Sequence, residues 1–106
     1  MEGPGHVLIV PPRGLLEVIH AEHPINPHET LLLRSPEGGR IVHLAFQGAH
    51  VYWLHDETGL LNPRARSVFE DLSGAHVVFT GHVLFTGIAE HTLGEIVARL
   101  SLRDPA

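Results

Sequence analysis

Histidine is the residue type through which this chain could do the most chemistry. Ten histidines occur among its 106 residues, while cysteine and lysine are both absent. A neutral imidazole binds transition metals, and its charge changes near neutral pH. The densest group of possible ligands contains His20, His23 and His28. If a helix reaches His23, the first two imidazoles lie on one helix face, and a loop could return His28 to complete an open three-histidine zinc site.

This metal hypothesis has a plainer alternative. The segment contains no HExxH or other established ligand pattern. Histidines at the end of a helix are also favourable because they lie near the negative end of the helix dipole. In the alternative these side chains are simply solvated, and the chain needs no cofactor. Under the metal hypothesis the cofactor is a divalent transition metal such as zinc.

Residues 40–56 have the pattern of a β-hairpin, and it organises the rest of the chain. Runs rich in β-branched and aromatic residues flank Gly48-Ala49, and glycine at the first loop position favours a type II′ turn. A two-residue loop at these positions places Gln47 opposite His50. His43 and His50 then lie about 13 Å apart along the strands, so the sequence predicts that they cannot share a metal ion.

Side-chain alternation divides this hairpin into two faces. One face is strongly apolar and is predicted to belong to the core: Val42, Leu44, Phe46, Val51 and Trp53. The other face is too apolar for full exposure and too polar for a deep core. We therefore expect it to pack against a helix or another subunit, through the predicted interface residues Ile41, His43, Tyr52 and Leu54.

Three further elements are predicted before the hairpin. Residues 6–10 form a short apolar run, typical of a buried strand. Apolar residues at helical spacing predict a helix over residues 14–22, and Pro24 ends it. Residues 29–34 have the composition of a strand, and residues 36–39 that of a turn. The expected result is an antiparallel meander of three strands, at about 29–35, 40–47 and 50–56.

After the hairpin, the clearest signal is a helix over residues 63–73. Asn62 is a good N-cap, proline occupies the first helical position, and Gly74 is a natural stop. Residues 75–86 favour a strand, either a single one with a bulge at its glycine or two short ones. Capping-box spacing then predicts a last helix over residues 92–102.

This order of elements predicts an α+β fold. We expect a single domain over residues 1–106, with a largely antiparallel sheet and about three helices packed mainly on one face. The alternative is an α/β fold. It would require parallel pairing of the first and last strands.

Two arginines in the first turn of the helix over residues 63–73 suggest a second kind of site. Arg64 and Arg66 lie where the helix dipole favours negative charge, so together with free N–H groups they could bind a phosphate or a carboxylate. In the alternative, Arg66 pairs with Glu70 one turn later, and Arg64 reaches a carboxylate elsewhere, such as that of Asp56.

Composition excludes several classes of function. Seven arginines against twelve acidic residues give a formal charge of −5, which disfavours nucleic-acid binding through a basic face. The absence of lysine excludes Schiff-base chemistry and a Walker lysine. No apolar run reaches the roughly 20 residues of a membrane span, and no signal peptide is recognisable. Together with the absence of cysteine, this predicts a cytoplasmic protein.

The leading hypothesis is a non-catalytic association module that forms a homodimer and buries Tyr52. No G-x-S-x-G nucleophile motif or phosphate-binding loop supports an enzyme. A metal-binding protein or metal-dependent hydrolase using His20, His23 and His28 is the second hypothesis. A small-anion or nucleotide-binding module at Arg64 and Arg66 is the third.

Overall fold

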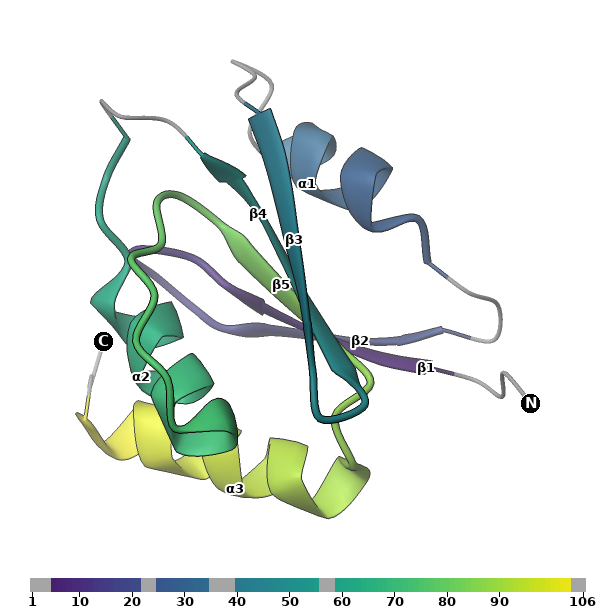
Figure 1. Cartoon of the computed structure of the whole chain (residues 1–106). Coiled ribbons are helices and arrows are strands. Elements are labelled where there is room, and N and C mark those ends of the chain that lie inside the picture. The colour runs from purple at the N-terminus through teal and green to yellow at the C-terminus, as the bar shows by residue number, and fades with distance from the viewer. Residues whose placement is uncertain (1–4, 22–24, 35–39, 56–58, 104–106) are drawn as a thin grey trace.

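In the part of the chain that the structure describes, five antiparallel strands form a single sheet in the order β2-β1-β5-β4-β3 (Figure 1). The computed structural model describes residues 5–21, 25–34, 40–55 and 59–103. The strands are β1 (Gly5–Val10), β2 (Glu17–Ala21), β3 (Arg40–Phe46), β4 (Ala49–His55) and β5 (Val83–Thr86). The helices are α1 (Pro27–Arg34), α2 (Pro63–Ser73) and α3 (Glu90–Arg103). The predicted α+β class and the largely antiparallel sheet are confirmed.

The helices divide unequally between the two faces of the sheet. α2 and α3 cover one face and α1 lies on the other (Figure 1). The larger core, beneath α2 and α3, includes Leu8, Val51, Trp53, Phe69, Phe79 and Ile96. The smaller core, on the α1 side, contains Val7, Ile9, Leu31, Leu54 and Leu84. β1 contributes to both cores, which explains why its sequence is continuously apolar rather than alternating.

Two predicted elements before the hairpin are wrong in type. Residues 14–22 are not a helix, because β2 occupies Glu17–Ala21 and pairs with β1. Their apolar residues also fit a strand, since Val18 packs in the larger core and Ile19 in the smaller. Residues 29–34 are not a strand but most of α1. The predicted three-strand meander is therefore absent, and the predicted turn at 36–39 lies outside the described residues.

The central hairpin is confirmed, but its turn lies one residue earlier than predicted. Phe46 pairs with Ala49, so the loop is Gln47-Gly48. Both loop residues have positive φ, 45° and 82°, as a type I′ turn requires and a type II′ turn does not. Every cross-strand pair consequently shifts by two residues. A shift of two preserves the side-chain faces but changes the cross-strand neighbours. Of the predicted core residues, Val51 and Trp53 are buried, and Val42 and Phe46 pack against the core as partly buried residues. The prediction is wrong for Leu44, which is 36% exposed on the edge strand.

The region 75–86 contains one short strand at its end. β5 covers Val83–Thr86, and Thr80 before it makes an isolated bridge to Leu61. Gly81 has a φ of 64°, so the chain bends between the bridge and the strand. β5 pairs with β1 in antiparallel orientation, which excludes the α/β alternative.

The two C-terminal helices agree closely with the sequence signals. The Asn62 side chain accepts a hydrogen bond from the backbone of Ala65 at 3.0 Å, and Gly74 ends α2 in the left-handed conformation with φ 77°. α3 begins at Glu90, two residues before the predicted capping box at Thr92. None of the helices in the described residues is long and apolar enough to cross a membrane.

Candidate functional site

His43 and His50 lie side by side on the α1 side of the central hairpin. His43 pairs with Tyr52, and Ala45 pairs with His50, so the two histidines are diagonal neighbours. Their ring centroids are 5.0 Å apart, and His43 Nε2 lies 2.8 Å from His50 Nδ1. The prediction that about 13 Å separates them is wrong. The error came from the turn position, because a shift of two residues turns a distant pair into a diagonal one.

Tyr52 and His28 extend this pair into a cluster that we call the histidine–tyrosine cluster (His28, His43, His50 and Tyr52). His43 stacks on Tyr52 with centroids 4.3 Å apart and an angle of 8° between the rings. His28, from α1, meets Tyr52 edge-on at 6.1 Å. His28 and His43 are exposed, while His50 and Tyr52 are half-buried. The cluster therefore places imidazole groups from two paired strands and from α1 at the surface.

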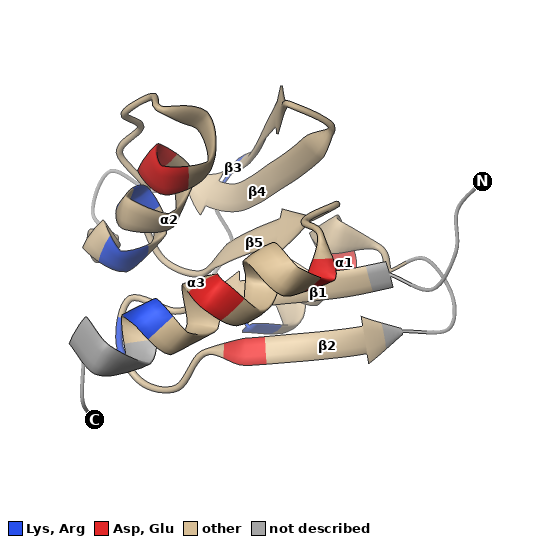
Figure 2. Ribbon diagram, turned by 90° about the horizontal axis from the view of Figure 1, so that it is seen from below, with Lys and Arg blue, Asp and Glu red and all other residues tan. Residues whose placement is uncertain are grey.

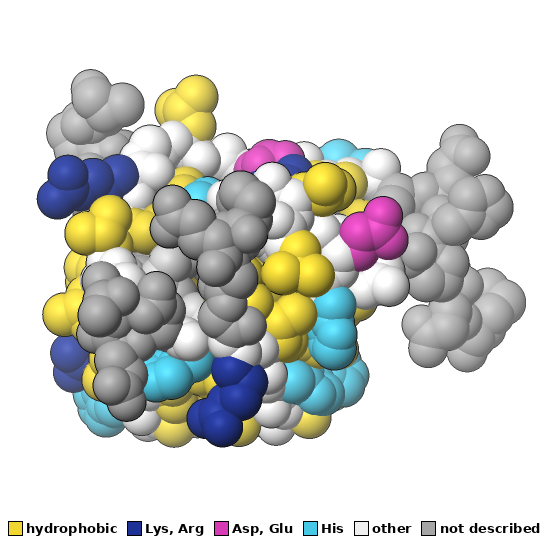
Figure 3. Space-filling model, turned by 90° about the horizontal axis from the view of Figure 1, so that it is seen from above, with side chains coloured by type: hydrophobic (Ala, Val, Ile, Leu, Met, Phe, Trp, Pro, Cys, Tyr) yellow, Lys and Arg dark blue, Asp and Glu magenta, His cyan; other side chains and the backbone are white. Residues whose placement is uncertain are grey.

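Histidine side chains reach the surface in several separate places. In Figure 3 they lie beside hydrophobic side chains along the margin of the face shown. α1 adds two exposed leucines to the surface, Leu32 at 43% and Leu33 at 74% exposure.

The predicted metal ligands do not share the helix on which that hypothesis depended. His20 lies on β2, where it meets His6 edge-on with ring centroids 4.5 Å apart. His28 lies on α1 and contacts Tyr52 instead. His23 is outside the described residues. Among the residues that the structure does describe, no group of three or more His, Asp or Glu side chains is arranged to hold a metal ion.

The two predicted anion-binding arginines point to different surroundings. Arg64 is half-buried and donates a hydrogen bond from Nη1 to the backbone oxygen of Pro11 at 3.1 Å. Arg66 is exposed and borders a hollow of about 180 Å³. Glu70, which the alternative paired with Arg66, has its carboxylate 3.2 Å from His76 Nδ1. The arginines are thus divided between a structural contact and the edge of a pocket.

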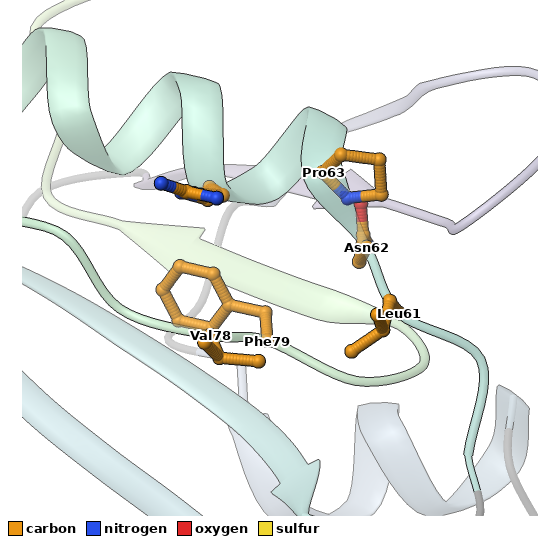
Figure 4. Close-up of a pocket in the computed structure, with 6 residues that line it drawn as sticks. Leu61, Asn62, Pro63, Val78 and Phe79 are labelled. Carbon is orange, nitrogen blue, oxygen red and sulfur yellow. The ribbon is translucent and has the colours of Figure 1, made fainter.

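That hollow is mainly apolar. Leu61, Pro63, Val78 and Phe79 line it together with Asn62 and Arg66, and Figure 4 shows the aliphatic and aromatic side chains around it. Ligand pockets usually measure about 300–1,000 Å³, so this one is small for a nucleotide. Its geometry gives little support to the anion or nucleotide hypothesis.

The predicted interface residues divide between α1 and the solvent. Leu54 is buried at 5% exposure within the smaller core, and Ile41 packs against that core. α1 thus provides the packing that the sequence assigned to a helix or another subunit. His43 remains exposed and Tyr52 half-buried. The part of this face that one short helix leaves uncovered lies along β3.

A charged contact fixes α1 against β2. Arg34 donates hydrogen bonds from Nε and Nη2 to the two carboxylate oxygens of Glu17, the former at 3.2 Å. These hydrogen bonds hold the pKa of the Glu17 carboxyl below its ordinary value of 4.5. Burial, reinforced by the Arg34 charge, lowers the pKa of His82 below 6.5.

No protein-family model, curated protein or solved structure matches this chain significantly.

Proposed function

We propose that this chain is a non-catalytic association module that forms a homodimer by pairing β3 with β3 of a second copy. The observation that carries the proposal is the position of β3. It is seven residues long, it lies at the edge of the sheet, and among the described residues it pairs with β4 alone. An edge strand presents unpaired N–H and C=O groups, which can template pairing with another chain.

The register determines which backbone groups face outward. In a hairpin with a two-residue loop, the residues that flank the loop exchange hydrogen bonds, and hydrogen-bonded pairs then alternate along the strands. Phe46, Leu44 and Val42 therefore face β4. Ile41, His43 and Ala45 direct their N–H and C=O groups away from the sheet, toward a partner strand.

β3 lacks the devices that usually protect an edge from association. Its sequence RIVHLAF contains no lysine or proline, and its only charge is on Arg40 at the start. Figure 2 shows the same distribution, with charged residues mainly on the helices and the start of strands. The opposite edge strand, β2, has five residues and carries the Glu17–Arg34 ion pair, so β3 is the better candidate.

The strand is also complementary to itself. Antiparallel pairing about a two-fold axis at His43 places Ile41 opposite Ala45 of the second copy and Val42 opposite Leu44. Apolar residues then meet apolar residues on either side of His43, which lies opposite His43 of the second copy, and about six new backbone hydrogen bonds form. The two sheets join into one continuous sheet with closed two-fold symmetry.

Ala45→Pro tests this proposal without disturbing the hairpin. The substitution removes an outward N–H, and edge strands tolerate proline where the N–H faces solvent. Each copy loses one donor, so we expect the dimer to weaken by at least about tenfold. Ala45→Val is the matched control, because it keeps the N–H and favours a strand.

Sedimentation equilibrium of the three proteins provides the measurement. We expect dimers for the unmodified chain and for Ala45→Val, and a shift toward monomer for Ala45→Pro. A monomeric unmodified chain at high micromolar concentration would contradict the proposal.

We also propose that the chain works in the cytoplasm, which the complete absence of cysteine supports.

A further inference from the structure

We propose that His43 and His50 form a two-imidazole binding site for a divalent transition metal ion, with Cu²⁺ as the preferred ion. The site lies within one chain, so it does not depend on the proposed dimer. It also uses different residues from the three-histidine site that the sequence suggested.

The separation of the two ring nitrogens fits coordination. His43 Nε2 and His50 Nδ1 are 2.8 Å apart. Two metal–nitrogen bonds of about 2.0–2.1 Å at a right angle place their nitrogens about 2.9 Å apart, whereas a tetrahedral angle places them about 3.3 Å apart. The observed separation is that of an N–H···N hydrogen bond, and it also lies near the spacing of two nitrogens bound to one metal ion.

The strands hold the two imidazoles in place before any metal binds. Both histidines stand on paired strands at diagonal positions, and Tyr52 stacks against the His43 ring. Without metal, one of the two facing nitrogens carries the proton of their hydrogen bond. On metal binding, that imidazole moves its proton to its other ring nitrogen, so both facing nitrogens present lone pairs. Neutral imidazoles exchange tautomers without a change in charge.

A second close histidine pair among the described residues is arranged differently. His6 and His20 meet with an angle of 81° between the rings, which directs the edge of one ring at the face of the other. His6 also lies 3.9 Å from the carboxylate of Glu90.

The chemistry of the ligands sets the order of metal preference. Imidazole nitrogen suits Cu²⁺, Ni²⁺ and Zn²⁺, and affinity for a given nitrogen site is highest for Cu²⁺. Two protein ligands leave the remaining positions to water.

Calorimetric titration with Cu²⁺ at pH 7.5, on the full untagged chain, tests the site. Folding of each variant is confirmed by circular dichroism. We expect His43→Ala and His50→Ala each to weaken the tightest binding step by at least about tenfold. His55→Ala, at an exposed position on the same hairpin, and His28→Ala should leave that step unchanged.

Electron paramagnetic resonance of the Cu²⁺-loaded chain gives an independent readout. The nitrogen splitting should indicate two coordinated imidazoles in the unmodified chain and one in His50→Ala. Equal affinity in the unmodified chain and in both His43→Ala and His50→Ala would overturn the proposal. A loss of the tightest step in His28→Ala alone would overturn it too, and would direct attention to the three-histidine hypothesis.

Discussion

At the scale of single residues, Asn62 connects three separate parts of the chain. It is buried at 1% exposure, and its side-chain oxygen caps α2 at Ala65. Its side-chain nitrogen donates to the backbone oxygens of Val10 and Gly81, both at 2.8 Å. Its backbone N–H donates to Phe79 at 2.9 Å. One amide thus joins the end of β1, the start of α2 and the approach to β5.

We predict that Asn62→Ala lowers the free energy of unfolding by about 3 kcal/mol. About 1 kcal/mol comes from the lost cap, and the rest from two carbonyl groups that lose their donor in a buried site. Urea unfolding, followed by the fluorescence of the buried Trp53, measures the change.

Asn26→Ala is the matched control, because Asn26 caps α1 in an exposed position and accepts a hydrogen bond from Glu29 at 3.2 Å. We expect the free energy of unfolding of that variant to fall by only about 1 kcal/mol. Equal losses in the two variants would contradict the connecting role of Asn62.

The sequence revealed part of this residue-scale picture. The cap at Asn62 is a local pattern, so the sequence predicted it. The bonds to Val10 and Gly81 depend on tertiary contacts and leave no local signal. The closeness of His43 and His50 depends on the turn, since moving a two-residue loop by one position changes each cross-strand neighbour by two.

At the scale of elements, the sequence predictions were wrong for two short segments whose apolar spacing fits either a helix or a strand. The signal for α1 was present in the sequence. Asn26-Pro27 repeats the cap and proline of Asn62-Pro63, Glu29 lies in the first turn, and Arg34 in the last. The leucine-rich composition of residues 29–34 outweighed it. β2 was not predicted because its apolar spacing fits either a helix or a strand. Its pairing with β1 decides for a strand, and that pairing is a tertiary contact.

The burial of His82, together with the charges of Arg34 and Glu17, predicts a dependence of stability on pH. Folding lowers the pKa of His82, so the unfolded chain binds a proton more readily than the folded chain does. The resulting stabilisation is present above the unfolded pKa of about 6.5, and it is lost as pH falls toward the lower folded pKa. Urea unfolding should therefore show that the free energy of unfolding changes less between pH 7.5 and pH 5.5 in His82→Gln than in the unmodified chain. An identical difference would contradict this account.

At the scale of the whole molecule, the two faces of the sheet receive unequal cover. Two helices cover one face, and the eight-residue α1 covers part of the other. The radius of gyration is 12.9 Å, which is that expected for one domain of this length, about 13 Å. The exposed remainder of the α1 face runs along β3, the strand at the edge of the sheet. Both proposals, the dimer and the metal site, concern this region.

Amide hydrogen exchange along β3 tests the central claim most directly. In an isolated chain, only the amides that face β4, such as those of Val42 and Leu44, are protected. In the proposed dimer, the amides of Ile41, His43 and Ala45 are hydrogen-bonded as well. We predict that their exchange slows as protein concentration rises, until it approaches that of their neighbours. Rapid exchange of these three amides at every concentration, beside a protected Val42 and Leu44, would contradict pairing through β3.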